Sequence, residues 1–442
     1  MILDFTTSNE LVAAHQFNKD IISNFALIYG KNNIGKSNLL RAVKESFQFL
    51  LKGQMNLSPF EPTISKVNSL FEMIIEDEEN EIRYGFEINI NNKIVIDEWM
   101  YSKVNRSSRE TKLFLRSEKF AHKDYFIASE RRLIEKVNGY TLLLTMFETT
   151  MKKNKLVLQM LDSLKTSVFI TCFEDPSDDD ILSQIIEINQ DPKLKNVFDA
   201  FILNADLDIK EVSVSQLNQE ENDLFTKINF VYKNIDKSIE AKKYIGLFVD
   251  EQSKMYYEVK NKRIVTKTDS GRNETYRIGF VHNSNMIFSY DELSSGTKQI
   301  LRIISIVISN LYDNSVFFID GIEADLHPDL VELLIHFFEM VVTTLPKNQF
   351  IITSHRDELL DIENISNQCK IFLKNTGTIG RIDITYLSNY KLRDYQSPSK
   401  RYKLDAFETN PMIIYEYQLL GSVEDLDLED TFKQDIQEDK DK

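Results

Sequence analysis

Short apolar runs alternate with segments of helical periodicity along this chain of 442 residues. Residues 25–29 form a continuous apolar run, typical of a buried strand, and apolar positions from residue 38 onward recur at helical spacing. In the second half, residues 316–319 and 349–353 predict further strands, and residues 300–307 predict an amphipathic helix. This alternation predicts an α/β core with a mainly parallel sheet.

A different pattern lies between these two halves. Residues 69–116 are rich in β-branched and aromatic side chains separated by turn-forming residues, which predicts an antiparallel hairpin or meander. Residues 120–245 are predicted to be mainly helical, and a further β segment is expected over residues 255–289. The acidic end after residue 422 is predicted to be disordered.

The segment joining the first strand to the first helix spells G-x-x-x-x-G-K-S. In this context the backbone N–H groups of the loop and of the helix N-terminus face phosphates. Lys36 is placed to reach the β- and γ-phosphates, and the Ser37 hydroxyl to bind Mg²⁺. The pattern predicts binding of ATP or GTP. The expected contacts in this loop are Gly30, Lys31, Asn32, Asn33, Ile34, Gly35, Lys36, Ser37 and Asn38.

Composition limits the setting and the partners. The chain is long enough for two or three lobes, and it has no apolar run able to span a bilayer. Its two cysteines, Cys172 and Cys369, suit a reducing compartment, and no secretory signal is visible, so a cytoplasmic location is expected.

The net charge of −16 argues against a generally basic DNA-binding protein. The tail from residue 422 contributes −6, which leaves −10 on the rest of the chain. Any nucleic-acid contact therefore needs a local patch, although a solvated helix face explains the best candidate more simply. That candidate comprises Arg131, Arg132, Lys136, Lys152, Lys153, Lys155 and Lys165.

The second half of the chain supplies a signature-like turn. Residues 293–299, Leu-Ser-Ser-Gly-Thr-Lys-Gln, open the predicted helix and resemble the LSGGQ-type signature of ABC/SMC-like ATPases. In that family the signature serine and glycine of one subunit cap the γ-phosphate bound by another. In isolation, the string could equally be an ordinary helix cap. The resemblance implies ATP contacts from Ser294, Ser295, Gly296 and Thr297.

Two further motifs follow in the order typical of this family. Asp320 ends the strand 316–319 as a Walker B aspartate, which binds Mg²⁺ directly or through water. His355 ends the next strand and matches the switch histidine that contacts the γ-phosphate in this family. The expected magnesium ligands are therefore Ser37 and Asp320.

The residue after Asp320 departs from the family pattern. The family has glutamate there to polarise the attacking water, whereas this chain has Gly321, which cannot act as a base. Either hydrolysis is slow and ATP acts chiefly as a clamp, or Glu323, Asp325 or His355 partly substitutes. We favour slow turnover. Glu323 also matches an acidic residue of the family. Its alternative role is to brace the loop in which it lies. The candidate catalytic residues are Asp320, Glu323 and His355.

Longer stretches resemble the AAA/ABC-type ATPases of the abortive-infection and OLD-like group, especially residues 29–42, 83–88, 97–101, 113–116 and 386–393. The resemblance implies a bacterial or phage-borne ATPase in anti-phage defence, built as nucleotide-sandwich homodimers or higher oligomers. Such ATPases, of PARIS or Septu-like type, act with a separate effector, commonly a nuclease. About fifty residues follow Arg393, too few for the Toprim nuclease domain of OLD nucleases.

The leading hypothesis is thus a P-loop NTPase of ABC/SMC-head type, with an antiparallel β subdomain and a helical insertion. It would use ATP and Mg²⁺ to gate an effector after a phage protein or nucleic acid is sensed, away from membranes. An SMC-like DNA repair or maintenance ATPase is the alternative, and a transporter subunit is the third. The expected parts are an ATPase lobe (1–119), the helical insertion (120–250), a second ATPase lobe (251–393) and a C-terminal segment (394–442).

Overall fold

The structure is a computed structural model of the 442-residue chain. It describes residues 6–7, 14–17, 20–52, 68–76, 80–104, 109–117, 121–122, 142, 168–171, 177–217, 264–269, 272–313, 315–375, 382–391 and 397–407. The basic residues between 131 and 165 and the acidic end after 422 lie outside these ranges.

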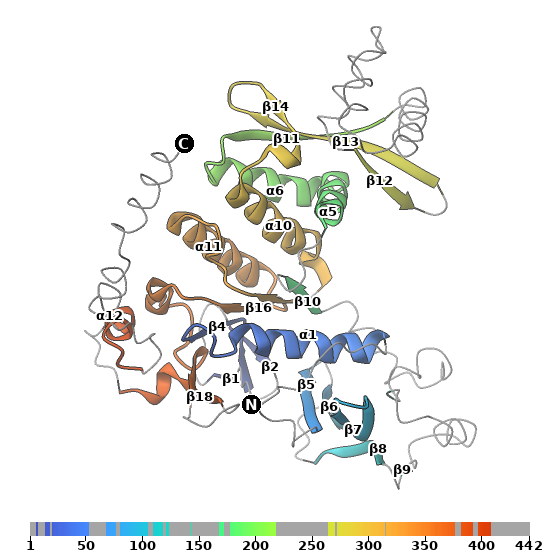
Figure 1. The fold of residues 1–442 in the computed structure, drawn as a ribbon, viewed down its shortest axis with the longest axis vertical. Helices are drawn as coiled ribbons and strands as arrows, with labels where there is room; N and C mark the ends of the chain where they lie inside the picture. Colours follow the sequence, from blue (N-terminus) through green and yellow to red (C-terminus); the bar gives the residue numbers. More distant parts are fainter. Residues whose placement is uncertain are drawn as a thin grey trace, which may run out of the picture.

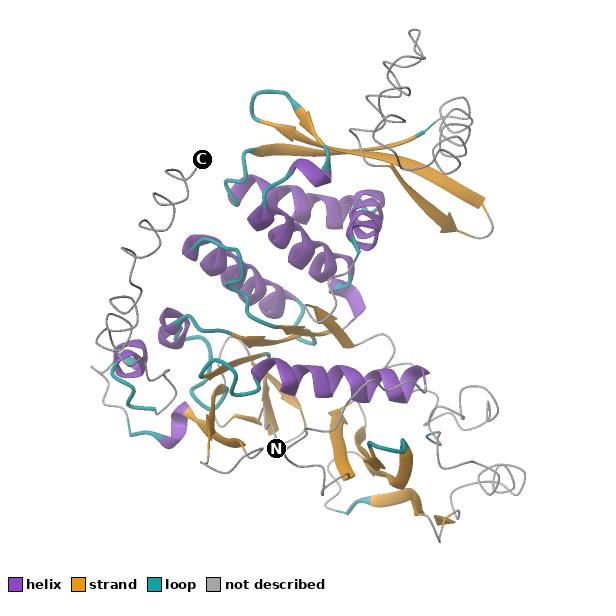
Figure 2. Cartoon of the chain, viewed as in Figure 1, coloured by secondary structure: helices purple, strands orange, loops and turns teal. Residues whose placement is uncertain are grey.

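A six-stranded sheet forms the centre of the molecule (Figures 1 and 2). Its order is β10 (Val168–Thr171), β15 (Val316–Ile319), β16 (Gln349–Thr353), β4 (Phe25–Gly30), β17 (Lys370–Asn375) and β18 (Ile382–Tyr386). All neighbours are parallel except β17 and β18, which are antiparallel. The predicted mainly parallel core is confirmed, and the three strands that carry nucleotide motifs lie side by side.

Helices cover both faces of this sheet, and the alternation along β4 shows which helix covers which face. Leu27 and Tyr29 belong to the cluster that contains α10 (Ser295–Ser309) and α11 (Pro328–Thr344). Ala26 and Ile28 face the other way and pack with Leu40 of α1 (Lys36–Lys52). Figure 1 shows α1 on one side of the sheet and α10 with α11 on the other.

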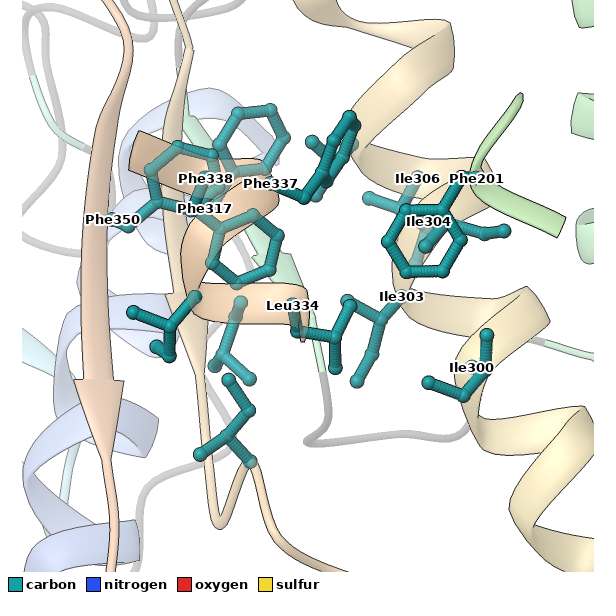
Figure 3. Packing of buried hydrophobic residues seen from close by; sticks show 14 of the residues in the cluster. Phe201, Ile300, Ile303, Ile304, Ile306, Phe317, Leu334, Phe337, Phe338 and Phe350 are labelled. Atoms are coloured by element: carbon teal, nitrogen blue, oxygen red, sulfur yellow. The ribbon is translucent and has the colours of Figure 1, made fainter. Parts of the chain in front are cut away.

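Aromatic side chains fill the layer between the sheet and α11 (Figure 3). Phe350 stacks on Phe338 at 4.2 Å and on Phe317 at 5.0 Å between ring centroids. All three are buried, and burial of each contributes about 2–3 kcal/mol. Phe201 of α6 (Pro192–Asn204) meets Phe337 at 5.1 Å, so this layer extends to α6 and its neighbour α5 (Asp178–Gln190).

Antiparallel sheets flank the core. The predicted meander is present as β5 (Asn68–Glu76), β6 (Asn80–Asn89), β7 (Ile94–Val104), β8 (Thr111–Ser117) and β9 (Ala121–His122). Phe49 of α1 packs on Phe86 of β6, with ring centroids 5.6 Å apart. A second antiparallel sheet contains β11 (Ile209–Gln216), β13 (Arg272–His282), β12 (Ile264–Asp269) and β14 (Ile287–Phe288). A third contains β1 (Thr6–Thr7), β3 (Asp20–Ser23) and β2 (Ala14–Phe17).

The range 120–250, predicted to be a mainly helical insertion, lies largely outside the described residues. In its described part, α5 and α6 are helical, but β10 joins the core sheet beside β15 and β11 pairs with β13. A four-residue strand with three apolar residues is too short to distinguish from a helical turn by periodicity, so the sequence does not reveal β10. Among the described residues, no helix has the length and apolar content needed to cross a bilayer.

Candidate nucleotide site

The site lies where three neighbouring parallel strands end. The carboxyl ends of β4, β15 and β16 meet at one edge of the sheet, the usual ligand position in open α/β sheets. Backbone bonds lock these ends together: the Ser354 N–H donates to the Ile28 carbonyl (3.1 Å), and the Ile322 N–H donates to the Thr353 carbonyl (3.2 Å). The phosphate loop, Asp320 and His355 are thereby brought together from distant parts of the sequence.

The phosphate loop closes around its own lysine. Gly35 has φ of 110°, a left-handed conformation in which a side chain is strained, and the loop then enters α1 at Lys36. The Lys36 Nζ donates to the carbonyls of Gly30 (2.7 Å) and Lys31 (3.2 Å). Burial lowers the pKa of Lys36, while the negative charges of Asp320 and Glu323 act to raise it. The motif predicts that this ammonium would contact the phosphates of a bound nucleotide.

Asp320 is oriented by a residue that the sequence motifs do not single out. The Thr353 hydroxyl donates to Asp320 Oδ1 at 2.5 Å and accepts the Gly321 N–H at 2.7 Å. Gly321 has φ of 59°, so its left-handed backbone aims that N–H at the threonine. The signal by which Thr353 could have been found is a polar residue directly after the apolar run of residues 350–352. Together the three residues fix the direction of the Asp320 carboxylate.

Glu323 holds the switch turn in this structure. One carboxylate oxygen accepts the His355 N–H and the other accepts the Ser354 hydroxyl, both at 2.8 Å. The Arg356 N–H in turn donates to the Ser354 hydroxyl at 2.9 Å. With both oxygens engaged, the geometry favours the bracing role of Glu323 over that of a base for water.

His355 presents its imidazole to solvent at this edge. Burial lowers the pKa of His355, and the positive charge of Lys36 lowers it further, whereas Glu323 and Asp320 oppose this. A pKa below the usual value near 6.5 keeps the ring neutral at pH 7, and a neutral ring can donate one hydrogen bond to a phosphate oxygen.

The donor set fits magnesium bound together with a nucleotide. Mg²⁺ in such sites takes one or two protein oxygens and fills its octahedron with phosphate and water. Asp320 keeps its second oxygen available beyond the one bonded to Thr353, and Ser37 is exposed at the start of α1. These two residues would hold the ion, which would neutralise charge on the β- and γ-phosphates.

The signature turn packs against the loop that follows Asp320. Ser294 caps α10 by accepting the Thr297 N–H at 3.2 Å, and Ser294 and Ser295 are exposed. A Cβ added at Gly296 would lie 2.8 Å from the Asp325 carbonyl oxygen, so this glycine allows α10 to approach the loop after β15. In the described part of the chain, no hydrogen bond or ion pair joins this turn to the phosphate loop.

The comparisons with known proteins bear on this arrangement. Residues 168–361 match the family model described as "AAA domain, putative AbiEii toxin, Type IV TA system". The match includes the signature turn, Asp320 and His355, and it covers less than half of the chain. No curated protein sequence matches.

Solved structures include two distant neighbours. The SMC head domain from Thermotoga maritima has 13% identity and a TM-score of 0.32, with 86% of this chain and 97% of that chain covered. The Smc head domain of Pyrococcus furiosus, bound to the C-terminal domain of ScpA, has 14% identity and a TM-score of 0.31, covering 88% and 96%.

The sheet order, the phosphate loop at the end of β4 and the family match together define the class of this protein. Its core has the P-loop NTPase fold, and residues 168–361 are similar to AAA domains. The individual contacts of its residues with nucleotide stay predictions from the motifs and the geometry.

Proposed function

We propose that this chain is an ATP-gated switch of bacterial anti-phage defence that controls a separate effector in the cytoplasm, with a nuclease as the expected effector class. One observation carries the proposal. The phosphate loop, Asp320 and His355 share one sheet edge, whereas the exposed Ser294 starts a helix packed on the face opposite α1. A second copy of the chain could bring its Ser294 to the phosphates bound by the first.

Such a dimer would contain two composite sites, and their energies would add. Moving a two-state equilibrium from 1:99 to 99:1 takes about 5.5 kcal/mol, or about 3 kcal/mol per site. A capped helix N-terminus facing a γ-phosphate, with its N–H groups as charge-assisted donors, supplies energies of this size. ATP binding alone could therefore drive association.

The defence role is supported by the resemblance to abortive-infection ATPases and by the toxin–antitoxin wording of the matching family. A sensor needs a long-lived ATP state more than rapid turnover. Gly321 carries no carboxylate and Glu323 is engaged by the switch turn, so slow hydrolysis suits this role. A phage protein or nucleic acid would be the trigger that changes this state.

The association step is directly testable. Sedimentation velocity of the purified chain is expected to show monomers without nucleotide or with ADP and Mg²⁺, and dimers or larger homo-oligomers with ATP and Mg²⁺. The ADP sample is the control, since it fills the phosphate loop without the γ-phosphate. A monomer at saturating ATP, or the same assembly in all three samples, would contradict the proposal.

Gly321→Glu tests the account of slow turnover. A Cβ at this position meets no atom within 4 Å, so the cost is the left-handed backbone, about 1–2 kcal/mol. A carboxylate that polarises water is expected to raise steady-state phosphate release by at least about tenfold, below the full range for general bases. Gly321→Gln controls for size and Gly321→Ala for backbone strain. An unchanged rate, or an equal rise with glutamine, would refute this account.

A further inference from the structure

A C-terminal segment is docked on the turn that leaves the switch histidine. This segment, Ser397 to Phe407, contains α12 (Pro398–Lys403), and we refer to residues 397–407 as the C-terminal brace. It packs on the 3₁₀ turn η4 (Asp357–Asp361), which begins two residues after His355. The proposed function does not use this contact.

Both ends of η4 are tied to the brace. At its last residue, Asp361, one carboxylate oxygen accepts the hydroxyls of Ser397 (2.8 Å) and Ser399 (2.6 Å), and the other accepts the Ser399 N–H (2.9 Å). At its first residue, Asp357 pairs with Lys403 at 2.9 Å. The brace therefore contacts η4 at both its first and its last residue.

The Asp361 end is the stronger of the two. Burial acts to raise the pKa of Asp361, but the hydrogen bonds from Ser399 and Ser397 hold it below its usual value. The buried ammonium of Lys370 lowers it further and donates to the Ile362 carbonyl at 2.7 Å. Asp361 is therefore a carboxylate at neutral pH, and its three accepted bonds are charge-assisted.

An aromatic cluster joins the brace to the phosphate-loop strand as well. Tyr402 of α12 meets Tyr29 edge-on, with ring centroids 5.7 Å apart, and Phe407 stacks on Phe372 at 4.7 Å. Tyr29 immediately precedes Gly30, and its buried hydroxyl donates to the Arg356 carbonyl at 3.0 Å. The brace thus contacts the strand that enters the phosphate loop, and Tyr29 of that strand bonds to the main chain that follows His355.

From these contacts we propose that the C-terminal brace positions His355 for the γ-phosphate, with Asp361 and Ser399 as positioning residues that act through η4. The inference rests on the proposed function, because it takes His355 as the γ-phosphate contact. Its consequence is reciprocal: whatever stabilises the docked brace strengthens ATP binding, and ATP strengthens docking of the brace. A partner that pulls on residues beyond 407 would then release ATP.

The test compares ATP with ADP, because both fill the phosphate loop and only ATP reaches His355. Isothermal titration of Asp361→Asn and of Ser399→Ala, each with Mg²⁺, is expected to show ATP affinity at least about fivefold weaker than wild type, the low end of typical coupling between sites. ADP affinity is expected to stay within about twofold. Hydrogen exchange in residues 398–403 should fall when wild type binds ATP and change little with ADP.

Leu404→Ala is the matched control, since Leu404 lies on the same segment with 82% of its surface exposed. It should leave both affinities unchanged. Equal weakening of ATP and ADP binding would show that the brace only supports the fold and would overturn the proposal, as would unchanged ATP affinity in both variants. If wild type binds ATP no more tightly than ADP, the γ-phosphate contributes no binding energy and the proposed function itself fails. If Asp361→Asn does not fold, Ser399→Ala, which removes a single hydroxyl, still tests whether the brace positions His355.

Discussion

Replacing Lys36 with alanine is expected to weaken binding of ATP and ADP by about a hundredfold, as measured by titration with a fluorescent nucleotide. A charge-assisted hydrogen bond in a partly buried site contributes about 1.5–3 kcal/mol, and each 1.4 kcal/mol is a factor of ten. Lys36 is 7% exposed and already positioned by two loop carbonyls, so little ordering is needed when phosphate binds.

The fold should tolerate this change. Among the described residues, Lys36 donates its side-chain hydrogen bonds to the carbonyls of Gly30 and Lys31, and water can replace an ammonium there. Arg41→Ala is the matched control, because it removes one positive charge from an exposed position of the same helix. In cells, Lys36→Ala is also expected to abolish effector control, so plaque counts should equal those of cells without the gene. Near-normal nucleotide affinity in Lys36→Ala would exclude the loop 30–37 as the phosphate site.

The nucleotide edge could be predicted because its parts are local. Gly30 to Ser37 form one loop, Asp320 and His355 each end an apolar run, and parallel strands bring their carboxyl ends to one edge of the sheet. The signature helix could also be predicted from a local pattern, because Ser294 is a good N-cap and the segment after it has regular apolar spacing.

The remaining features depend on tertiary contacts that no local pattern specifies. β10 is a four-residue strand that pairs with β15, which is about 150 residues away in sequence. The bond from Thr353 to Asp320 spans 33 residues, and that from Ser399 to Asp361 spans 38. Serine and threonine have partners too varied for these pairings to be deduced from sequence.

The structure also decides which signature variant is informative. From the signature motif alone, a substitution at Gly296 and one at Ser294 would be equally suitable for blocking assembly. A side chain at Gly296 would collide with the Asp325 backbone of its own chain, so loss of assembly could follow from a damaged fold. Ser294 is exposed and its side chain bonds to Thr297, so its replacement can be chosen to preserve the cap.

Ser294→Asp is accordingly expected to abolish ATP-dependent association while leaving the monomer intact. Aspartate caps helices as well as serine does, and its charge is favourable at a helix N-terminus. In the proposed dimer, however, the carboxylate would face a γ-phosphate. Two like charges about 4 Å apart repel by about 4 kcal/mol near a protein surface, roughly a thousandfold in the association constant for each site.

Ser294→Asn separates charge from shape in this experiment. Asparagine has the size of aspartate and caps equally well, so it should weaken association by about tenfold at most. Sedimentation velocity with ATP and Mg²⁺ measures association, and nucleotide titration of the dilute monomer shows whether binding to the phosphate loop is retained. If the aspartate and asparagine variants associate equally, the Ser294 turn does not face the phosphates of a second copy. If only the aspartate variant stays monomeric while it binds ATP normally, the γ-phosphate is the group that this turn meets.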